Sequence, residues 1–296
     1  MMNILRWTVI VIGSLASLLI LVGLVAVGVL FVEAKQKPQG KPQYVALGSS
    51  FAAGIGLGNR IKGSPIVCQR SDSGYPAQLA RLRNLELVDM TCSGATATHV
   101  LQGGQVFLGP QIDAVGPQTE LVTLTAGGND ISYVGDLALG AGSRSKSIAG
   151  WFMGRIWSGP KAEGDRDYAK VHDDLVSTFR EIRRRAPRAR IVVLTYPQIV
   201  PPGDACPTLQ LPQTEVDAMR EVGDRLAAVT RQAGSDAGVD VIDMQALGAA
   251  HHACSAEPWV NGWVDAKNTP FHPTLEGARA MAQAVGDLLD GKATAS

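Results

Sequence analysis

The amino-acid sequence predicts an α/β fold with a parallel sheet covered by helices on both faces. Short apolar runs alternate along the chain with longer helix-like stretches, as expected for successive βαβ units. The runs are continuously apolar rather than alternating, which is typical of strands buried on both faces. Glycine-rich polar segments follow the first three runs, where open parallel sheets form their ligand sites.

The strands and helices are expected in one domain, residues 43–296. Its strands are expected at Tyr44–Leu47, Leu85–Met90, Leu121–Thr125, Ile191–Thr195 and Val239–Met244. The clearest helices are expected at Tyr168–Arg185, Thr214–Ala233 and Thr274–Leu289. With 296 residues, 46% of them hydrophobic, the chain can build the core of one such domain of ordinary size.

The N-terminal segment, residues 1–33, is predicted to be a transmembrane anchor. No charged residue occurs from Trp7 to Val32, a run longer than the ~20 residues that span a bilayer. Small residues on either side of Glu33 also fit a cleavable signal, which is the alternative interpretation. Residues 34–42 contain two prolines and a glycine, so we expect them to form a linker.

The cysteines indicate an oxidising compartment. There are four cysteines, and none lies in a C-x-x-C pair or another zinc-like spacing. Three pairings are open, of which Cys68–Cys92 with Cys206–Cys254 closes loops of moderate length, and we predict that one. Disulfides would place the domain outside the cytoplasm, whereas four buried thiols in a cytosolic enzyme are the alternative. We therefore expect a protein that is anchored to the cell membrane or secreted, although the lysines that follow the apolar run lean slightly the other way.

Charge and motifs argue against several classes of function. Lys+Arg and Asp+Glu both number 27, so the net charge is zero and no overall field would attract nucleic acid. The glycines from Gly54 to Gly58 resemble a dinucleotide fingerprint, but Asn59 stands where G-x-G-x-x-G needs glycine. Neither a phosphate-binding P-loop nor an H-E-x-x-H zinc motif is present. We expect neither a cofactor nor a metal.

The residues after the expected strands suit acyl transfer. A serine nucleophile needs a base, and the reaction needs donors for the oxyanion that develops. Ser50 follows the first strand, and His272 precedes the last helix. The backbone N–H groups of Ser50 and Gly94 and the side-chain amide of Asn129 are the candidate donors. Separately, the serine fits a helix cap, the asparagine a turn and the histidine a surface position, so only their joint occurrence favours catalysis.

Four segments together resemble the SGNH (GDSL) hydrolase family. They are Gly48–Gly54, Cys92–Ala95, Gly127–Asp130 and Phe271–Thr274, in the order and spacing of the family's four blocks. Cys254 ahead of Trp259–Gly262 is similar to the disulfide-containing secreted esterases and lipases. The resemblance implies a three-layer α/β/α, flavodoxin-like fold with a five-stranded parallel sheet. It also implies a serine ester hydrolase that works through an acyl-enzyme.

The sequence departs from the family pattern at two positions. Ser49 and Thr269 stand where the family usually has aspartates, and the second departure removes the carboxylate that orients the histidine. By resemblance to some secreted members, the Thr269 backbone carbonyl would hold the imidazole instead. We therefore predict a Ser50–His272 dyad. Asp265 is the alternative third member.

The expected substrate is a small-molecule or lipid ester. The aromatic, apolar segment Ile148–Trp157 is a candidate lid or acyl-binding wall, although a helix packed on the core explains it equally well. We expect a monomer that meets the membrane through its N-terminal segment and does not bind nucleic acid. Two other functions remain open: a tethered binding protein that has lost catalysis, and a thioester or polysaccharide deacetylase.

Overall fold

The computed structural model describes residues 2–34, 42–263 and 269–292, without the side chains of residues 2–14, 16 and 34. The described residues contain a five-stranded, wholly parallel sheet in the order β2-β1-β3-β4-β5. Its strands are β1 (Tyr44–Gly48), β2 (Leu87–Asp89), β3 (Leu121–Thr125), β4 (Arg190–Leu194) and β5 (Asp240–Ile242). This order is that of flavodoxin-like sheets, in which ligands bind at the carboxyl ends of β1 and β3. The predicted fold class is confirmed for this domain.

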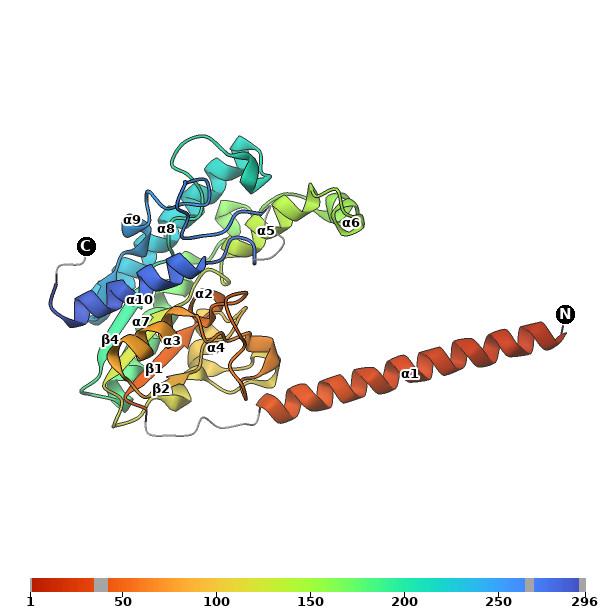
Figure 1. The fold of residues 1–296 in the computed structure, drawn as a ribbon, viewed down its shortest axis with the longest axis horizontal. Helices are drawn as coiled ribbons and strands as arrows, with labels where there is room; N and C mark the ends of the chain where they lie inside the picture. The colour runs from red at the N-terminus through yellow and green to blue at the C-terminus, as the bar shows by residue number, and fades with distance from the viewer. Residues whose placement is uncertain (1, 35–41, 264–268, 293–296) are drawn as a thin grey trace.

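Helices cover both faces of the sheet and make three layers (Figure 1). One face packs on α4 (Ala97–Gln102), α7 (Tyr168–Arg185) and α8 (Gln213–Ala237). The other face packs on α3 (Tyr75–Arg83) and α10 (Leu275–Leu289). Successive residues of β1 point to opposite faces, so Val45 joins the first core and Ala46 the second. Because both faces are buried, the strands are apolar throughout, as the sequence indicates.

The remaining helices of the domain lie outside these two helical layers. They are α2 (Ser50–Ala53), α5 (Tyr133–Ser143), α6 (Ile148–Ile156) and α9 (Met244–Leu247), with the 3-10 turns η1 (Ile66–Cys68), η2 (Gln105–Phe107), η3 (Gln111–Ala114), η4 (Glu163–Asp165) and η5 (Pro207–Leu209). In Figure 1, α5 and α6 extend from the body of the domain as one arm.

The edge strands are shorter than the sequence predicts. Asn84, in the left-handed conformation at φ 51°, caps α3, and the Leu85 N–H donates to the Ala80 carbonyl, so the chain is still leaving the helix there. At the other edge, Asp243 ends β5 because its side chain accepts a hydrogen bond from the Ala246 N–H and caps α9. These local bonds withdraw both ends from the sheet.

The N-terminal segment is one helix, α1 (Met2–Ala34), which extends from the domain (Figure 1). Its C-terminal end contacts the domain, where the Phe31 and Phe107 rings meet edge to face at 6.0 Å and the Ile66 N–H donates to Glu33 Oε2 at 2.8 Å. Among the residues described, no helix is both long and apolar enough to cross a membrane. The anchor predicted for residues 1–33 therefore has no support from the structure. Most of the predicted linker lies outside the described residues.

Two disulfides, Cys68–Cys92 and Cys206–Cys254, confirm the predicted pairing. They close loops of 24 and 48 residues and leave no free cysteine in the described chain. Bridges of this kind persist in oxidising compartments, which is consistent with a protein that acts outside the cytoplasm.

Candidate active site

Ser50 is the first residue of α2, two residues after the end of β1, an interior strand that lies between β2 and β3. Gly48 precedes it at φ +132°, and a Cβ there would lie 2.3 Å from the Thr125 carbonyl oxygen. Only glycine therefore lets β1 approach β3 so closely before the chain turns into α2. The Ser50 side chain is 5% exposed, so the hydroxyl is held in the structure rather than displayed on a surface turn.

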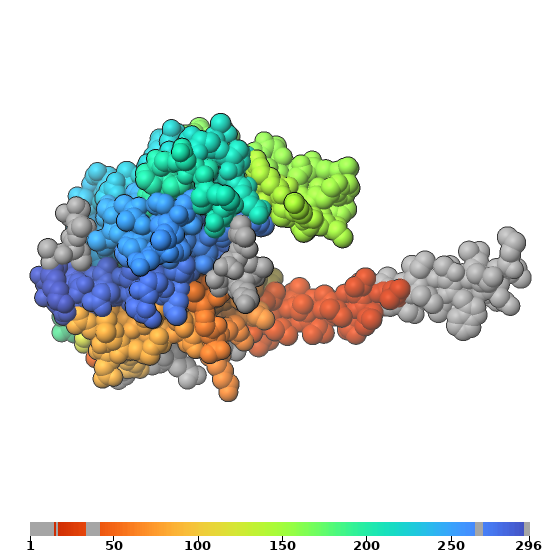
Figure 2. Space-filling model, turned by 45° about the horizontal axis from the view of Figure 1, so that its top comes forward, coloured from red at the N-terminus to blue at the C-terminus, as the bar shows by residue number. Residues whose placement is uncertain are grey.

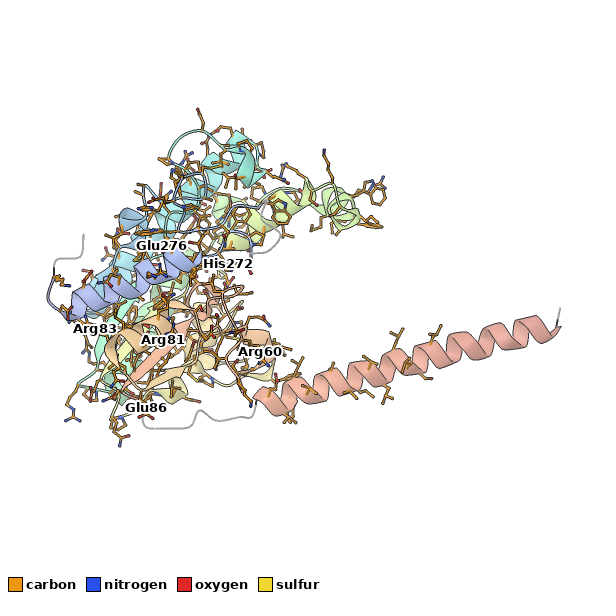
Figure 3. All side chains as sticks on the ribbon, viewed as in Figure 1. Arg60, Arg81, Arg83, Glu86, His272 and Glu276 are labelled. Carbon is orange, nitrogen blue, oxygen red and sulfur yellow. A yellow bond between two sulfur atoms is a disulfide. The ribbon has the colours of Figure 1, made fainter. Side chains whose placement is uncertain are left out.

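His272 contacts the Ser50 side chain directly. The distance from His272 Nε2 to Ser50 Oγ is 2.7 Å, across 222 residues of sequence. The other ring nitrogen, Nδ1, lies 2.8 Å from the Pro270 carbonyl oxygen. A carbonyl can only accept, so Nδ1 carries the proton and Nε2 is left to accept from the Ser50 hydroxyl. In Figure 3, His272 lies at the edge of the body from which the arm of α5 and α6 extends.

The carbonyl that holds His272 is that of Pro270, and the prediction of Thr269 is wrong by one residue. Buried Phe271 has a positive φ of 55°, and the turn made there aims the preceding carbonyl at the ring. The Thr269 carbonyl instead accepts a 3.4 Å hydrogen bond from the Asn261 amide. Asp265, the alternative orienting group, lies outside the described residues.

Burial lowers the pKa of His272 to about 4, and the hydrogen bond to Pro270 offsets this only in part. The imidazolium would be poorly solvated in this position, so the neutral ring is favoured down to acidic pH. Phe51 contributes to that environment, because its ring lies 5.2 Å from the imidazole. A neutral histidine with a free Nε2 lone pair is the form that can take a proton from serine.

The loop of Gly94 is fixed by the first disulfide and by its neighbours. The Cys92 N–H donates to the Gly48 carbonyl at 2.9 Å, and the Ser93 N–H donates to the Cys68 carbonyl at 3.1 Å. Gly94 itself has φ +81°, a conformation that L side chains rarely adopt. Its N–H makes no hydrogen bond within the part of the chain that is described, so it is available to a ligand.

Asn129 joins the loop after β3 to the loop after β2. Its Nδ2 donates to the Ala95 carbonyl at 2.8 Å, which orients the amide and uses one of its two hydrogens. Asp130 accepts from the Ala97 N–H with both carboxylate oxygens, at 3.2 and 3.0 Å. Burial raises the pKa of this carboxyl to about 6. Together, the Asn129 and Asp130 side chains fasten the two loops at the carboxyl edge of the sheet.

Two supporting residues escape sequence reasoning. The Tyr196 hydroxyl lies 2.9 Å from Ser49 Oγ and accepts from the Gly128 N–H at 3.2 Å, which links the loops of Ser50 and Asn129. Gln111 bonds both backbone groups of Gly48, at 2.8 and 3.0 Å. Tyr196 follows the expected strand Ile191–Thr195 directly, so its place at a strand end is a signal that could have found it. Gln111 lies in a 3-10 turn and has no such signal.

The structure thus brings Ser50 and His272 into contact and joins the loops of Gly94 and Asn129 to each other. Within the described residues, no three His, Cys, Asp or Glu side chains gather in a group that could hold a metal ion. The arrangement offers a candidate nucleophile, a neutral candidate base and available N–H groups, which are the groups that acyl transfer requires.

Comparisons with known proteins agree with this chemistry. Residues 46–280 match the model of the GDSL-like lipase/acylhydrolase family. The chain is 31% identical over 287 residues to Lipase 2 of Streptomyces coelicolor, with 90% of this chain and 94% of that protein covered.

Two solved structures have a similar fold. The extracellular lipase of Streptomyces rimosus is 28% identical with a TM-score of 0.61, covering 79% of this chain and 94% of that one. The phospholipase A1 of Streptomyces albidoflavus is 28% identical with a TM-score of 0.65, covering 84% and 98%.

Proposed function

The chain belongs to the GDSL-like lipase/acylhydrolase family and is a carboxylic ester hydrolase, and we propose that it works through a Ser50–His272 dyad. The observation that carries this proposal is the 2.7 Å contact between Ser50 Oγ and His272 Nε2. It supports a working pair of nucleophile and base, and not a binding protein that has lost its catalytic residues.

In the proposed reaction, Ser50 Oγ attacks the carbonyl carbon of the ester and its proton passes to His272 Nε2. The oxyanion accepts hydrogen bonds from the Ser50 and Gly94 N–H groups and from the second amide hydrogen of Asn129. Collapse breaks the C–O bond to the alcohol, which leaves with the proton from His272. Water then attacks the acyl-enzyme with the same histidine as base, and carboxylic acid and free Ser50 result.

A backbone carbonyl takes the place of the usual orienting carboxylate in this proposal. The Pro270 carbonyl can fix the tautomer of His272, but it carries no full charge to stabilise the imidazolium. The negative charge that develops on the substrate oxygen supplies that counter-charge instead. More of the stabilisation therefore falls to the oxyanion donors than in a triad.

We further propose that the substrate is a lipid or small-molecule ester and that the enzyme acts outside the cytoplasm. The named relatives are lipases and one solved neighbour is a phospholipase A1, which supports an acyl-chain substrate. Both disulfides support the location. Retention at the membrane by residues 1–33 rests on the uncharged run of the sequence alone. Fractionation of cells that express the full chain, with sequencing of the mature N-terminus, tests retention against cleavage.

The catalytic assignment is tested by active-site labelling. A fluorophosphonate should modify Ser50, and Ser50→Ala should abolish hydrolysis of a chromogenic ester series while its circular dichroism stays unchanged. Asp265→Asn is the control for the dyad. Loss of turnover by ~10,000-fold would make Asp265 a third member, and labelling of Ser49 or Ser93 would refute the choice of nucleophile.

A further inference from the structure

The helix α6 carries large apolar side chains on its outer side. Ile148 is 80% exposed, Trp151 52%, Phe152 59% and Ile156 82%. These four residues are called the α6 face below. Figure 2 shows the segment as a yellow-green lobe that projects from the body. Four neighbouring apolar side chains exposed to this degree are unusual on a domain that only meets water.

The contact between α6 and α5, by contrast, contains glycines. A Cβ at Gly154 would lie 2.8 Å from the Ser143 carbonyl oxygen, and one at Gly142 would lie 2.9 Å from Met153 Cε. Glycines thus allow the two helices to approach closely, while Ser147 caps α6 by accepting from the Gly150 N–H. The local sequence builds a stable helix whose bulky residues face outward, so exposure of the α6 face is a consequence of its packing.

The charged residues within the segment that contains α6 all have one sign. From residue 143 to residue 162 the sequence holds Arg144, Lys146, Arg155 and Lys161 and no acidic residue, in a chain of zero net charge. Arg144 pairs with Glu215 at 2.7 Å. Arg155 lies over the Trp151 ring at 3.9 Å, and no carboxylate in the described chain pairs with Arg155, Lys146 or Lys161. Aromatic and aliphatic side chains beside basic ones are typical of helices that lie in the interface of an anionic membrane.

The arm that carries the α6 face begins at the loop of Asn129, one of the proposed oxyanion donors. The helix α5, on which α6 packs, starts at Tyr133, three residues after the Asn129–Asp130 pair. A Cβ at Gly142 would lie 3.0 Å from the Trp263 side chain, so Trp263, nine residues before His272, packs against α5 as well. Figure 3 places His272 on the side of the body from which α5 and α6 project. A surface that contacts α6 would therefore lie on the side of the body that carries His272.

We propose that the α6 face docks on the surface of an anionic lipid bilayer. The apolar side chains enter the boundary between headgroups and acyl chains, and Lys146, Arg155 and Lys161 meet the phosphates. A second copy of the chain would satisfy the apolar side chains but would bring like charges together, so the charges favour lipid. This inference rests on the proposed function only for its purpose, which is to bring lipid esters to the site.

The first test measures binding in the full chain without hydrolysis. Ser50→Ala is compared with Ser50→Ala/Trp151→Phe, and the difference in emission is that of Trp151 alone. On vesicles of brominated phosphatidylglycerol this emission should fall by about half, because the bromines sit at the depth that interfacial side chains reach. Brominated phosphatidylcholine should quench it less, and added salt should weaken the effect. Absence of quenching on the anionic vesicles would overturn the proposal, whether or not Ser50 is the nucleophile.

The second test separates docking from chemistry. Phe152→Ser/Ile156→Ser removes two apolar anchors, so hydrolysis of dilute phosphatidylglycerol vesicles should fall at least ~10-fold. kcat/KM for a soluble short-chain ester should not change. The matched control is Leu82→Ser, which replaces a 55% exposed leucine on α3 and should leave both rates intact. Equal losses on both substrates would refute docking, as would a Trp151 emission that shifts with protein concentration in the absence of lipid.

Discussion

At the scale of single residues, the site depends on what surrounds His272 more than on the histidine itself. Asn261, which is buried, donates to the His272 carbonyl at 3.1 Å through its side chain, and the Phe271 N–H donates to the Asn261 carbonyl, also at 3.1 Å. These bonds hold the turn at Phe271, which directs the Pro270 carbonyl toward His272 Nδ1. The proposed base thus donates its orienting hydrogen bond to a backbone carbonyl, and burial is the main cause of its lowered pKa.

This environment predicts an unusually acidic limit to activity. His272 must be neutral to accept the Ser50 proton, so activity is lost only as the pH falls through its lowered pKa, about 4. At pH 5 such a base is still ~90% neutral, whereas one with the ordinary pKa of 6.5 would be only ~3% neutral. The profile of kcat/KM for a soluble ester should therefore stay near its plateau at pH 5. A loss of kcat/KM centred near pH 6.5 would contradict the lowered pKa of His272.

Asn129 should be essential for rate although it does not touch the nucleophile in this structure. If Asn129 is the proposed oxyanion donor, Asn129→Ala should lower kcat by roughly 100- to 1,000-fold, with little change in KM. Thr269→Ala is the matched control, because it changes a side chain near the base while every backbone carbonyl stays in place. It should alter kcat little. Similar losses in both variants would mean that loop disruption, and not oxyanion binding, sets the rate.

At the scale of elements, the sequence predicts those parts that periodicity alone determines. The range expected for α7 matches the observed one, and all five strands lie where apolar runs predict them. The predictions fail where a tertiary contact decides. The Pro270 carbonyl is selected by the positive φ of Phe271, and Gln111 reaches Gly48 across 63 residues. Neither interaction leaves a periodic pattern in the sequence, because each depends on where another segment of the chain is placed.

The two disulfides tether different segments of the chain. Removing either should lower stability, but only one of them should also affect activity. Cys68→Ala/Cys92→Ala frees the loop that carries Gly94, whereas Cys206→Ala/Cys254→Ala frees segments around η5. Each pair of substitutions should lower the free energy of unfolding by about 2–5 kcal/mol. Only the first should also lower kcat, measured at a temperature where both variants remain folded. Equal kcat values in the two variants would show that the Gly94 loop does not need its covalent tether.

At the scale of the whole molecule, the position of β1 between β2 and β3 explains why distant segments meet. Both neighbours of β1 run parallel to it, so their following loops reach the same edge as Ser50. That edge buries ionisable groups of opposite kind: Asp130, whose pKa is raised by burial, and His272, whose pKa is lowered by it. Burial favours the uncharged form of both groups. Asp130 is uncharged at low pH and His272 at high pH, so the two groups stabilise the fold at opposite ends of the pH range.

The two groups predict opposing pH dependences of folding stability. The folded pKa of Asp130, about 6, lies above its unfolded value, so its contribution is present below pH ~4 and is lost as the pH rises to about 6. The folded pKa of His272, about 4, lies below its unfolded value of ~6.5, so its contribution is present above pH ~6.5 and is lost as the pH falls to about 4. Between these limits the two slopes oppose each other.

In the wild type the two pH dependences partly cancel, so single variants are needed to measure each of them. As the pH rises from 4 to 6, the free energy of unfolding of Asp130→Asn should increase relative to that of wild type, by on the order of 2 kcal/mol. Over the same rise, that of His272→Gln should decrease relative to wild type by a similar amount. Asparagine keeps an oxygen that can accept from the Ala97 N–H, so the hydrogen bond to the first residue of α4 is retained. Urea unfolding at closely spaced pH values measures both differences. Stability curves that run parallel to wild type in either variant would mean that the group titrates as it does in the unfolded chain, and that its burial at this edge is not maintained in solution.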